Sequence, residues 1–179
     1  MSSSSFPDLL RAAQAGHGWA FDELFRRWNG PLTGFVRARG VADVDAVVND
    51  VLLRAFGALA SFEGDEAGFR AWLFTIARNR VIDEARRAER GPSTTRLEAA
   101  TSMPGGDVVA DAEHRFGEER IAALLDLLTD DQREVLTLRF VADMTIDQIA
   151  EATGRRRGAV KQLQRRALRR LERVLELDA

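Results

Sequence analysis

The sequence predicts an all-α fold of two small helical domains joined by a flexible linker, and three observations support this prediction. The 179 residues include no tyrosine and show no sustained alternation of β-branched and polar residues, so no strands are predicted. Apolar residues recur at the three-and-four spacing of amphipathic helices, most clearly over residues 43–59. The only long stretch of loop-like composition is 91–117, which contains GPSTT and SMPGGD. The predicted domains are therefore 1–90 and 118–179.

The first domain is predicted to be a helical bundle whose elements are limited by glycine, proline and polar breaks. Gly30 and Pro31 are expected to end one helix and begin the next, because proline lacks the backbone N–H that a helix interior needs. An acidic loop containing glycine, residues 61–68, precedes the last helix, in which Phe69 and Leu73 are predicted to be core residues. The predicted helices span residues 6–15, 19–29, 31–39, 43–59 and 69–90.

The second domain is predicted to contain helices at 118–128 and 131–140 followed by a helix-turn-helix. Thr145 and Gln148 have the spacing of a capping box, which opens a short helix that ends near Gly154. A final helix is expected over residues 157–177. Apolar side chains at the three-and-four spacing would bring these two helices together, namely Ile146, Ile149, Ala150, Val160 and Leu163.

Charge is strongly polarised within this second domain. Residues 118–154 carry nine acidic and three basic side chains, whereas residues 155–179 carry nine basic and three acidic ones. The acidic residues Asp126, Asp130, Asp131 and Glu134 are expected to face solvent or a basic protein partner, because they would repel phosphate. The basic segment contains side chains suited to phosphates and base edges, which we predict to bind DNA: Arg155, Arg156, Arg157, Lys161, Gln162, Arg165 and Arg166.

Residues 61–90 form a second candidate nucleic-acid surface. Aromatic side chains beside arginines suit single-stranded nucleic acid, because bases stack on rings and arginines hold the backbone. Trp72 could serve as such a ring or could belong to the core, and both assignments stay open. The end of the predicted helix carries Arg78, Arg80, Arg86, Arg87 and Arg90.

Several functional classes are not indicated by the sequence. The chain has no cysteine and two widely separated histidines, so no catalytic, metal or cofactor site is predicted. The carboxylates Asp43, Asp45 and Asp50 lack the spacing of a calcium loop and fit a solvated or partner-binding face better. With no visible signal peptide and no apolar run long enough to span a bilayer, the expected location is the cytoplasm, without a membrane segment.

Three segments together resemble the extracytoplasmic-function (ECF) sigma factors of bacterial RNA polymerase. AFDELFRRWNGPLTGFVRARG followed by DVDAVVNDVLLRAFGALASF is similar to the first half of their region two, and FRAWLFTIARNRVIDEARR to the second half. LTDDQREVLTLRFVADMTIDQIAEATGRRRGAVKQLQRRALRRL is similar to region four. The order of the three segments and the chain length also match, and the resemblance covers residue 19 to about 175 apart from the linker.

The resemblance implies a non-enzymatic subunit that lends promoter recognition to core RNA polymerase. Helix 43–59 would bind the clamp helices of the largest subunit, while helix 157–170 would enter the major groove of the −35 element and the other side of its domain would dock on the flap. An anti-sigma factor is also implied. The residues implied for polymerase are Asp45, Asn49, Asp50 and Arg54, and those for opening the −10 element are Ser61, Phe62, Glu63, Trp72, Arg78, Arg80 and Arg86.

The distance between the two promoter elements constrains the linker. Elements about 20 base pairs apart are separated by roughly 70 Å, at about 3.4 Å per pair. A linker of 27 residues spans roughly 90 Å when fully extended. We therefore predict that residues 91–117 are extended and ordered only when the protein is bound to polymerase.

Two other functions remain compatible with the residues alone. A stand-alone helix-turn-helix regulator would bind an operator without polymerase, although it would not need segment 43–90. A helical protein-interaction module would carry the same basic helix without contacting DNA, and would keep its function after charge reversal at Arg157, Lys161 and Arg165.

Overall fold

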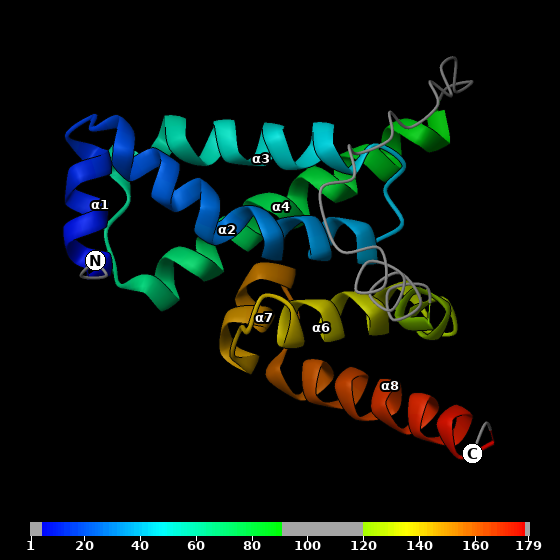
Figure 1. Cartoon of the computed structure of the whole chain (residues 1–179). Helices are drawn as coiled ribbons and strands as arrows, with labels where there is room; N and C mark the ends of the chain where they lie inside the picture. The colour runs from blue at the N-terminus through cyan, green and yellow to red at the C-terminus, as the bar shows by residue number, and fades with distance from the viewer. Residues whose placement is uncertain (1–4, 91–119, 178–179) are drawn as a thin grey trace, which may run out of the picture.

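The computed structural model describes residues 5–90 and 120–177, and every regular element within these ranges is helical. Figure 1 shows one body made of the helices before residue 91 and a second body, made of the helices after residue 119, lying against it. The predicted all-α class is confirmed. The predicted linker, 91–117, lies outside the described residues.

The first body is built around three helices, with a fourth short helix across one end (Figure 1). Its core combines aromatic and aliphatic side chains that are fully buried, among them Leu24, Phe35, Phe69, Leu73 and Phe74. The prediction that Phe69 and Leu73 belong to the core is confirmed. The elements are α1 (Phe6–Gln14), α2 (Gly18–Ala38), α3 (Val44–Ala58), the 3-10 turn η1 (Leu59–Ser61) and α4 (Glu66–Arg90).

The predicted helix break at Gly30 and Pro31 is wrong, because α2 continues through both residues. A proline inside a helix costs about 3 kcal/mol through its missing N–H and its clash with the preceding turn. Fully burying one large apolar side chain contributes about 1.5–3 kcal/mol. Here a buried stripe continues on both sides of the proline and outweighs its cost: Leu24, Trp28, Leu32 and Phe35.

Helix α4 begins at Glu66, before the predicted start at Phe69. The Asp65 carboxylate accepts a hydrogen bond of 2.7 Å from the backbone N–H of Gly68, as an N-cap residue does. The loop that precedes the helix is therefore shorter than predicted, and its last three expected positions, 66–68, are helical.

The second body contains the predicted helix-turn-helix. Residues 120–126 are helical and are followed by α6 (Asp130–Phe140), α7 (Ile146–Thr153) and α8 (Arg157–Leu177). The capping box at Thr145 is confirmed, since Gln148 donates its backbone N–H to the Thr145 hydroxyl at 3.2 Å and the Gln148 side chain accepts from Thr145 at 2.8 Å. A second capping box, missed in the sequence, joins Thr129 and Gln132 at the start of α6.

Gly154 makes the turn between α7 and α8 with a backbone φ of 67°, in the left-handed region that side chains with a Cβ avoid. Gly154→Ala is therefore expected to lower the free energy of unfolding by about 1 kcal/mol, measured by thermal or urea denaturation. Gly158→Ala is the matched control: it lies inside α8 with open space around it, so alanine should be neutral or stabilising. Equal effects of the two substitutions would contradict this account of the turn.

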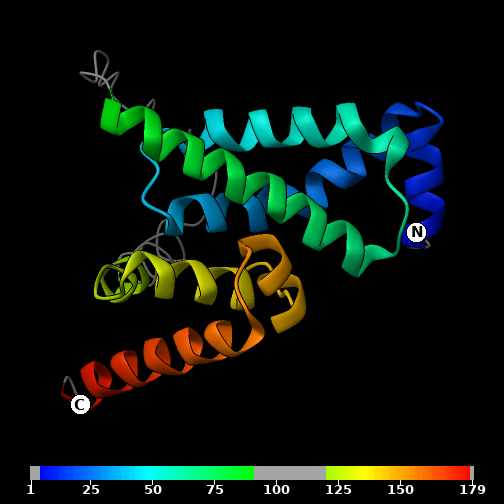
Figure 2. The same ribbon diagram turned by 180° about the vertical axis from the view of Figure 1, so that it is seen from behind.

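The two bodies share an interface in which α6 lies between α2 and α8 (Figure 2). Val135, Leu138 and Met144 belong to the same buried apolar cluster as Leu32 and Phe74 of the first body. The core therefore continues from one body into the other, although a linker separates them in sequence.

Candidate nucleic-acid interface

The first half of α8 carries the exposed basic surface that the sequence predicted. Val160 and Ala167 are buried on the inner side of the helix, so the other side faces outward. Among the exposed side chains, Arg157 forms an ion pair with Asp147 of α7. The exposed candidates are Arg156, Arg157, Lys161, Gln162, Arg165 and Arg166.

Arg155 differs from the other candidates because carboxylates already hold it. Its guanidinium donates to the buried carboxylate of Glu134 at 2.5 Å and also forms an ion pair with Asp131. The prediction that the acidic side chains of this domain face solvent or a basic protein partner is wrong for Glu134, which is 4% exposed. Its basic partners lie within the chain itself.

The predicted DNA contacts on α4 fall into three different environments. Arg78 is 17% exposed and its Nε donates to the Glu134 carboxylate of the second body at 2.9 Å. Arg86 is exposed. Arg80 is 10% exposed, with Nε bound to Asp50 and Nη1 bound to Glu84, both at 2.6 Å. This placement corrects the prediction that Arg80 holds the DNA backbone, because carboxylates of the first body already occupy its guanidinium.

The ion pairs around Arg80 shift two pKa values. Burial alone would raise the pKa of Asp50, but hydrogen bonds from Arg54 and Arg80 lower it below its ordinary value. Burial alone would lower the pKa of Arg80, but its bonds to Glu84 and Asp50 raise it. Asp50 therefore braces α3 against α4 through Arg80. Arg54 lies 3.0 Å from Asp50 within α3, and both residues border the predicted polymerase face.

The lowered pKa of Asp50 predicts a specific loss of stability in acid. A carboxylate whose folded pKa lies below its unfolded value stabilises the fold above the unfolded pKa, which is about 3.9, and loses that contribution as pH falls through the folded pKa. Thermal melting of Asp50→Asn should therefore show a smaller drop below about pH 4 than the unmodified chain. Asp45→Asn, on an exposed position of the same helix, is the control and should keep the full drop.

Phe62, in the loop before α4, forms an aromatic cluster with Phe69 and Trp72 of α4. The Phe62 ring lies 5.1 Å from the Trp72 ring and 5.3 Å from the Phe69 ring, measured between centroids. Phe62 and Trp72 are both partly buried, so each rests on the core and keeps an accessible part. Ser61 and Glu63 are exposed beside them. Trp72 therefore packs on the core and keeps an accessible part, while its contact with DNA stays a prediction.

The outer face of α3 contains an apolar residue that the sequence analysis missed. Asp45 and Asn49, both predicted to contact polymerase, are exposed, and Leu53 continues their row one turn further along. Leu53 is 72% exposed, whereas Val51 and Leu52 beside it are buried. The four-residue spacing of 45, 49 and 53 could have predicted that Leu53 shares this face, because residues four apart lie on one side of a helix.

Comparisons with known proteins identify the family. The chain matches the family models for Sigma-70 region 2 over residues 24–91 and Sigma-70, region 4 over residues 124–173. The ECF RNA polymerase sigma factor BldN of Streptomyces coelicolor is 34% identical over 188 residues, covering 99% of this chain and 68% of BldN. The chain belongs to the ECF sigma factors. The ECF sigma factor SigK of Mycobacterium tuberculosis is 28% identical over 181 residues, covering 98% of this chain and 96% of SigK.

Solved sigma-factor structures share the fold. CnrH, solved in complex with the cytosolic domain of CnrY, has a TM-score of 0.69 and 26% identity, and the match covers 98% of this chain and 100% of that one. The sigma factor RpoE of Bartonella quintana, solved with the anti-sigma factor NepR, has a TM-score of 0.64 and 24% identity, covering 89% of this chain and 98% of that one.

As an ECF sigma factor, the chain is a transcription initiation factor that binds core RNA polymerase and directs promoter-specific initiation. The stand-alone regulator is disfavoured, because the region 2 match spans the segment that such a regulator would not need. Within the part of the chain that the structure describes, no group of three or more His, Cys, Asp and Glu side chains is placed to hold a metal ion. None of the helices in that part is long and apolar enough to cross a membrane.

Proposed function

We propose that this sigma factor recognises the −35 element with the first half of α8. The observation that carries the proposal is the helix-turn-helix itself, which fixes α8 at Gly154 and leaves its basic side exposed. Arg157, Lys161 and Arg165 recur every four residues, so they line one side that can follow a groove. Exposed Arg156, Gln162 and Arg166 flank that side, while Arg155 is held by carboxylates in this structure.

The −10 element would be opened by the aromatic cluster at the start of α4. Phe62 and Trp72 offer ring surfaces on which an unpaired base can stack, and Ser61 and Glu63 are exposed polar groups beside them. Unstacking a base costs a few kcal/mol, and a surface that receives the extruded base recovers part of this cost. Arg78 and Arg86 would hold the DNA backbone, whereas Arg80 would act by bracing α3 against α4.

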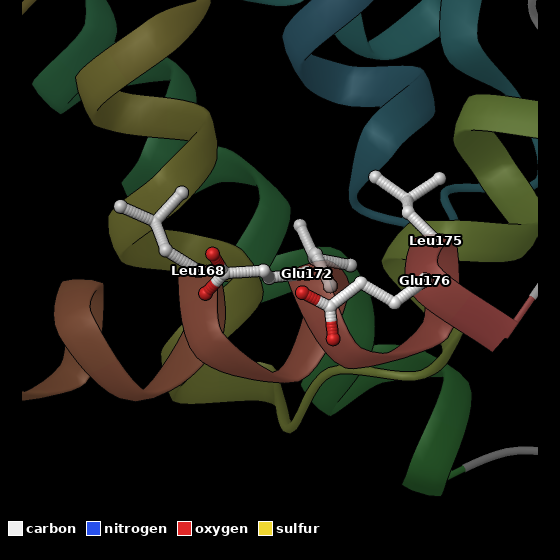
Figure 3. Close-up of a pocket in the computed structure, with 5 residues that line it drawn as sticks. Leu168, Glu172, Leu175 and Glu176 are labelled. Atoms are coloured by element: carbon white, nitrogen blue, oxygen red, sulfur yellow. The ribbon is translucent and has the colours of Figure 1, made fainter. Parts of the chain in front are cut away.

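Core polymerase would be bound by one surface on each region. On region 2, the row Asp45, Asn49 and Leu53 would meet the clamp helices, with Asp50 and Arg54 at its border. On region 4, an apolar groove lies on the second half of α8, C-terminal to the proposed −35 residues, and would receive the flap. Figure 3 shows side chains of this groove, which is lined by Leu168, Leu171, Glu172, Leu175 and Glu176.

The remaining assignments follow from the family and from CnrH. Residues 1–90 would bind polymerase and the −10 element, and residues 118–179 would bind the −35 element. Residues 91–117 would be the linker between them. CnrH was solved with a domain of another protein, so we also assign this chain an anti-sigma factor. It would act in the cytoplasm, without enzymatic activity and without a cofactor.

Mixing the full chain with core polymerase tests this proposal against the stand-alone regulator. The two should co-elute in gel filtration, and the free chain should bind duplex DNA weakly, because its proposed recognition surface is confined to the first half of one helix. Nanomolar binding of an operator duplex by the free chain, without co-elution with polymerase, would overturn the proposal.

A further inference from the structure

The side chain of Gln14 ties α1 to the loop that is proposed to open the −10 element. Gln14 is the last residue of α1, which runs beside the segment between α3 and α4 (Figure 1). Its Nε2 donates to the carbonyl of Leu59 at 3.1 Å and to the carbonyl of Phe62 at 2.9 Å. A side-chain amide nitrogen carries two N–H donors. Both are therefore directed at one loop, which lies 45 and 48 positions further along the chain.

The two carbonyls lie at opposite ends of the 3-10 turn η1. Leu59 begins this turn and Phe62 follows it directly. Within the turn, the Phe62 backbone N–H donates to the Leu59 carbonyl at 3.1 Å, and the Ser61 hydroxyl donates to the Ala58 carbonyl at 2.9 Å. A single 3-10 turn makes few internal hydrogen bonds, and their geometry is poorer than in an α-helix. A side chain that binds both ends therefore fixes the turn to the rest of region 2.

Gly64 makes room for the ring of Phe62. A Cβ added to Gly64 would lie 3.1 Å from the Cζ atom of this ring. Gly64 also has a backbone φ of 151°, which residues with a Cβ rarely adopt. The ring packs on Phe69 and Trp72 at centroid distances of 5.3 and 5.1 Å. Phe62 is thus held through its ring by region 2 and through its carbonyl by Gln14.

Gln14 acts on the loop and contributes little to the core. It is exposed, whereas Ala13 beside it is buried. Replacing its amide therefore removes the two bonds to the loop and leaves the apolar packing of α1 in place. Ser61 and Glu63, on either side of Phe62 in sequence, are exposed and accessible to an unpaired base. Groups that are already held in the binding arrangement lose less conformational freedom on binding, which raises affinity.

We propose that Gln14 is a positioning residue for −10 recognition, whose amide holds residues 59–62 so that Phe62 and its exposed neighbours meet an unpaired base in one fixed arrangement. The proposal rests on the function proposed above for this loop, and it requires no contact between Gln14 and DNA. It predicts that the amide controls selectivity between bases, whereas the affinity for core polymerase is independent of it.

The base selectivity of the holoenzyme tests this role. The full chain bound to core polymerase is mixed with a pool of single-stranded DNA of random sequence, and the bound strands are recovered and sequenced. The unmodified chain should enrich particular bases at fixed positions. With Gln14→Leu the strongest enrichment should fall about fivefold, the factor that corresponds to one neutral hydrogen bond. Co-elution with core polymerase and the melting temperature of the full chain should stay close to those of the unmodified chain.

Two further substitutions test whether hydrogen-bond donation is the cause. Gln14→Glu is similar in shape but its carboxylate only accepts, so it would repel the two carbonyls and should lose selectivity as Gln14→Leu does. Gln14→Lys keeps donors for carbonyl oxygens and should keep most of the enrichment. Selectivity compares bases bound by the same chain, so a changed charge, which acts on the backbone of every strand, does not alter it.

Gly64 provides a test from the other side of Phe62. Gly64→Ala places a Cβ against the ring and should lower the enrichment in the same direction as Gln14→Leu. Gly57→Ala is the matched control: Gly57 lies inside α3 with open space around it, so selectivity should be unchanged. Equal selectivity of the two alanine variants would overturn the proposal, because the placement of Phe62 would then not govern the choice of base.

The outcomes separate this inference from the proposed function. If the unmodified holoenzyme enriches particular bases and Gln14→Leu enriches them equally, the positioning role is wrong and the proposed function stands. Loss of selectivity in Gln14→Lys would also overturn the positioning role, since donation would not be its cause. If the unmodified holoenzyme enriches no base, the assignment of the −10 element to this loop fails, and this inference fails with it.

Discussion

Exchanging Arg157, Lys161 and Arg165 for glutamate is expected to abolish promoter-directed RNA synthesis while leaving association with core polymerase unchanged. Each residue lies on the exposed basic side of α8, so each exchange replaces attraction to phosphate with repulsion. A lost contact of this kind costs about 1–3 kcal/mol, so binding of a −35 duplex by the holoenzyme should fall by about a thousandfold or more. The measurements are run-off transcription and co-elution with core enzyme.

The matched control moves the same charge change to the second half of the same helix. Arg169, Arg170 and Arg173 are exposed on α8 beyond the proposed recognition residues. Their exchange for glutamate should reduce binding of the −35 duplex only slightly, whereas transcription also depends on the proposed contact of this half of α8 with the flap. If instead the first triple variant initiates transcription normally, α8 does not read DNA, and the chain is better explained as a helical protein-interaction module.

Leu53→Glu is expected to weaken the binding of the chain to core polymerase strongly. Leu53 is 72% exposed beside Asp45 and Asn49, so its substitution should leave the fold intact, while a buried apolar contact of an interface would be replaced by a buried charge. Centrally placed interface residues cost about 2 kcal/mol or more when removed, so affinity should fall about thirtyfold or more. Gel filtration and competition against the unmodified chain measure this loss.

Trp19→Glu provides the control for Leu53→Glu. Trp19 is also a large apolar side chain with an exposed fraction of 52%, but it lies at the start of α2. The Trp19→Glu variant should keep the full affinity for core polymerase. Unchanged affinity of Leu53→Glu would show that the row of residues 45, 49 and 53 does not face polymerase.

The helix-turn-helix could be predicted because its signals are local. Thr145 and Gln148 lie three residues apart, and Gly154 adopts a conformation that few other residues tolerate. Packing then required only that Ile149 and Val160 be apolar and correctly spaced. Each of these features can be recognised within a window of about four turns of helix.

The features that sequence analysis missed depend on contacts between distant segments. Pro31 is a local signal for a helix end, and only burial of Trp28 and Leu32 against other helices overrides it. Glu134 looks like an exposed acidic residue until Arg78, 56 positions away in sequence, is brought beside it. Likewise, Arg80 resembles a DNA contact until the fold places Asp50 and Glu84 around it. Local sequence patterns do not contain this pairing information.

Run-off transcription with purified core polymerase on a library of promoter sequences tests the central claim most directly. If regions 2 and 4 act together as a sigma factor, the full chain alone should direct core enzyme to a subset of templates that share two separated sequence elements. Transcripts should decline when either element is changed. Core enzyme that gains no promoter-specific transcripts from the chain, despite binding it, would contradict the account.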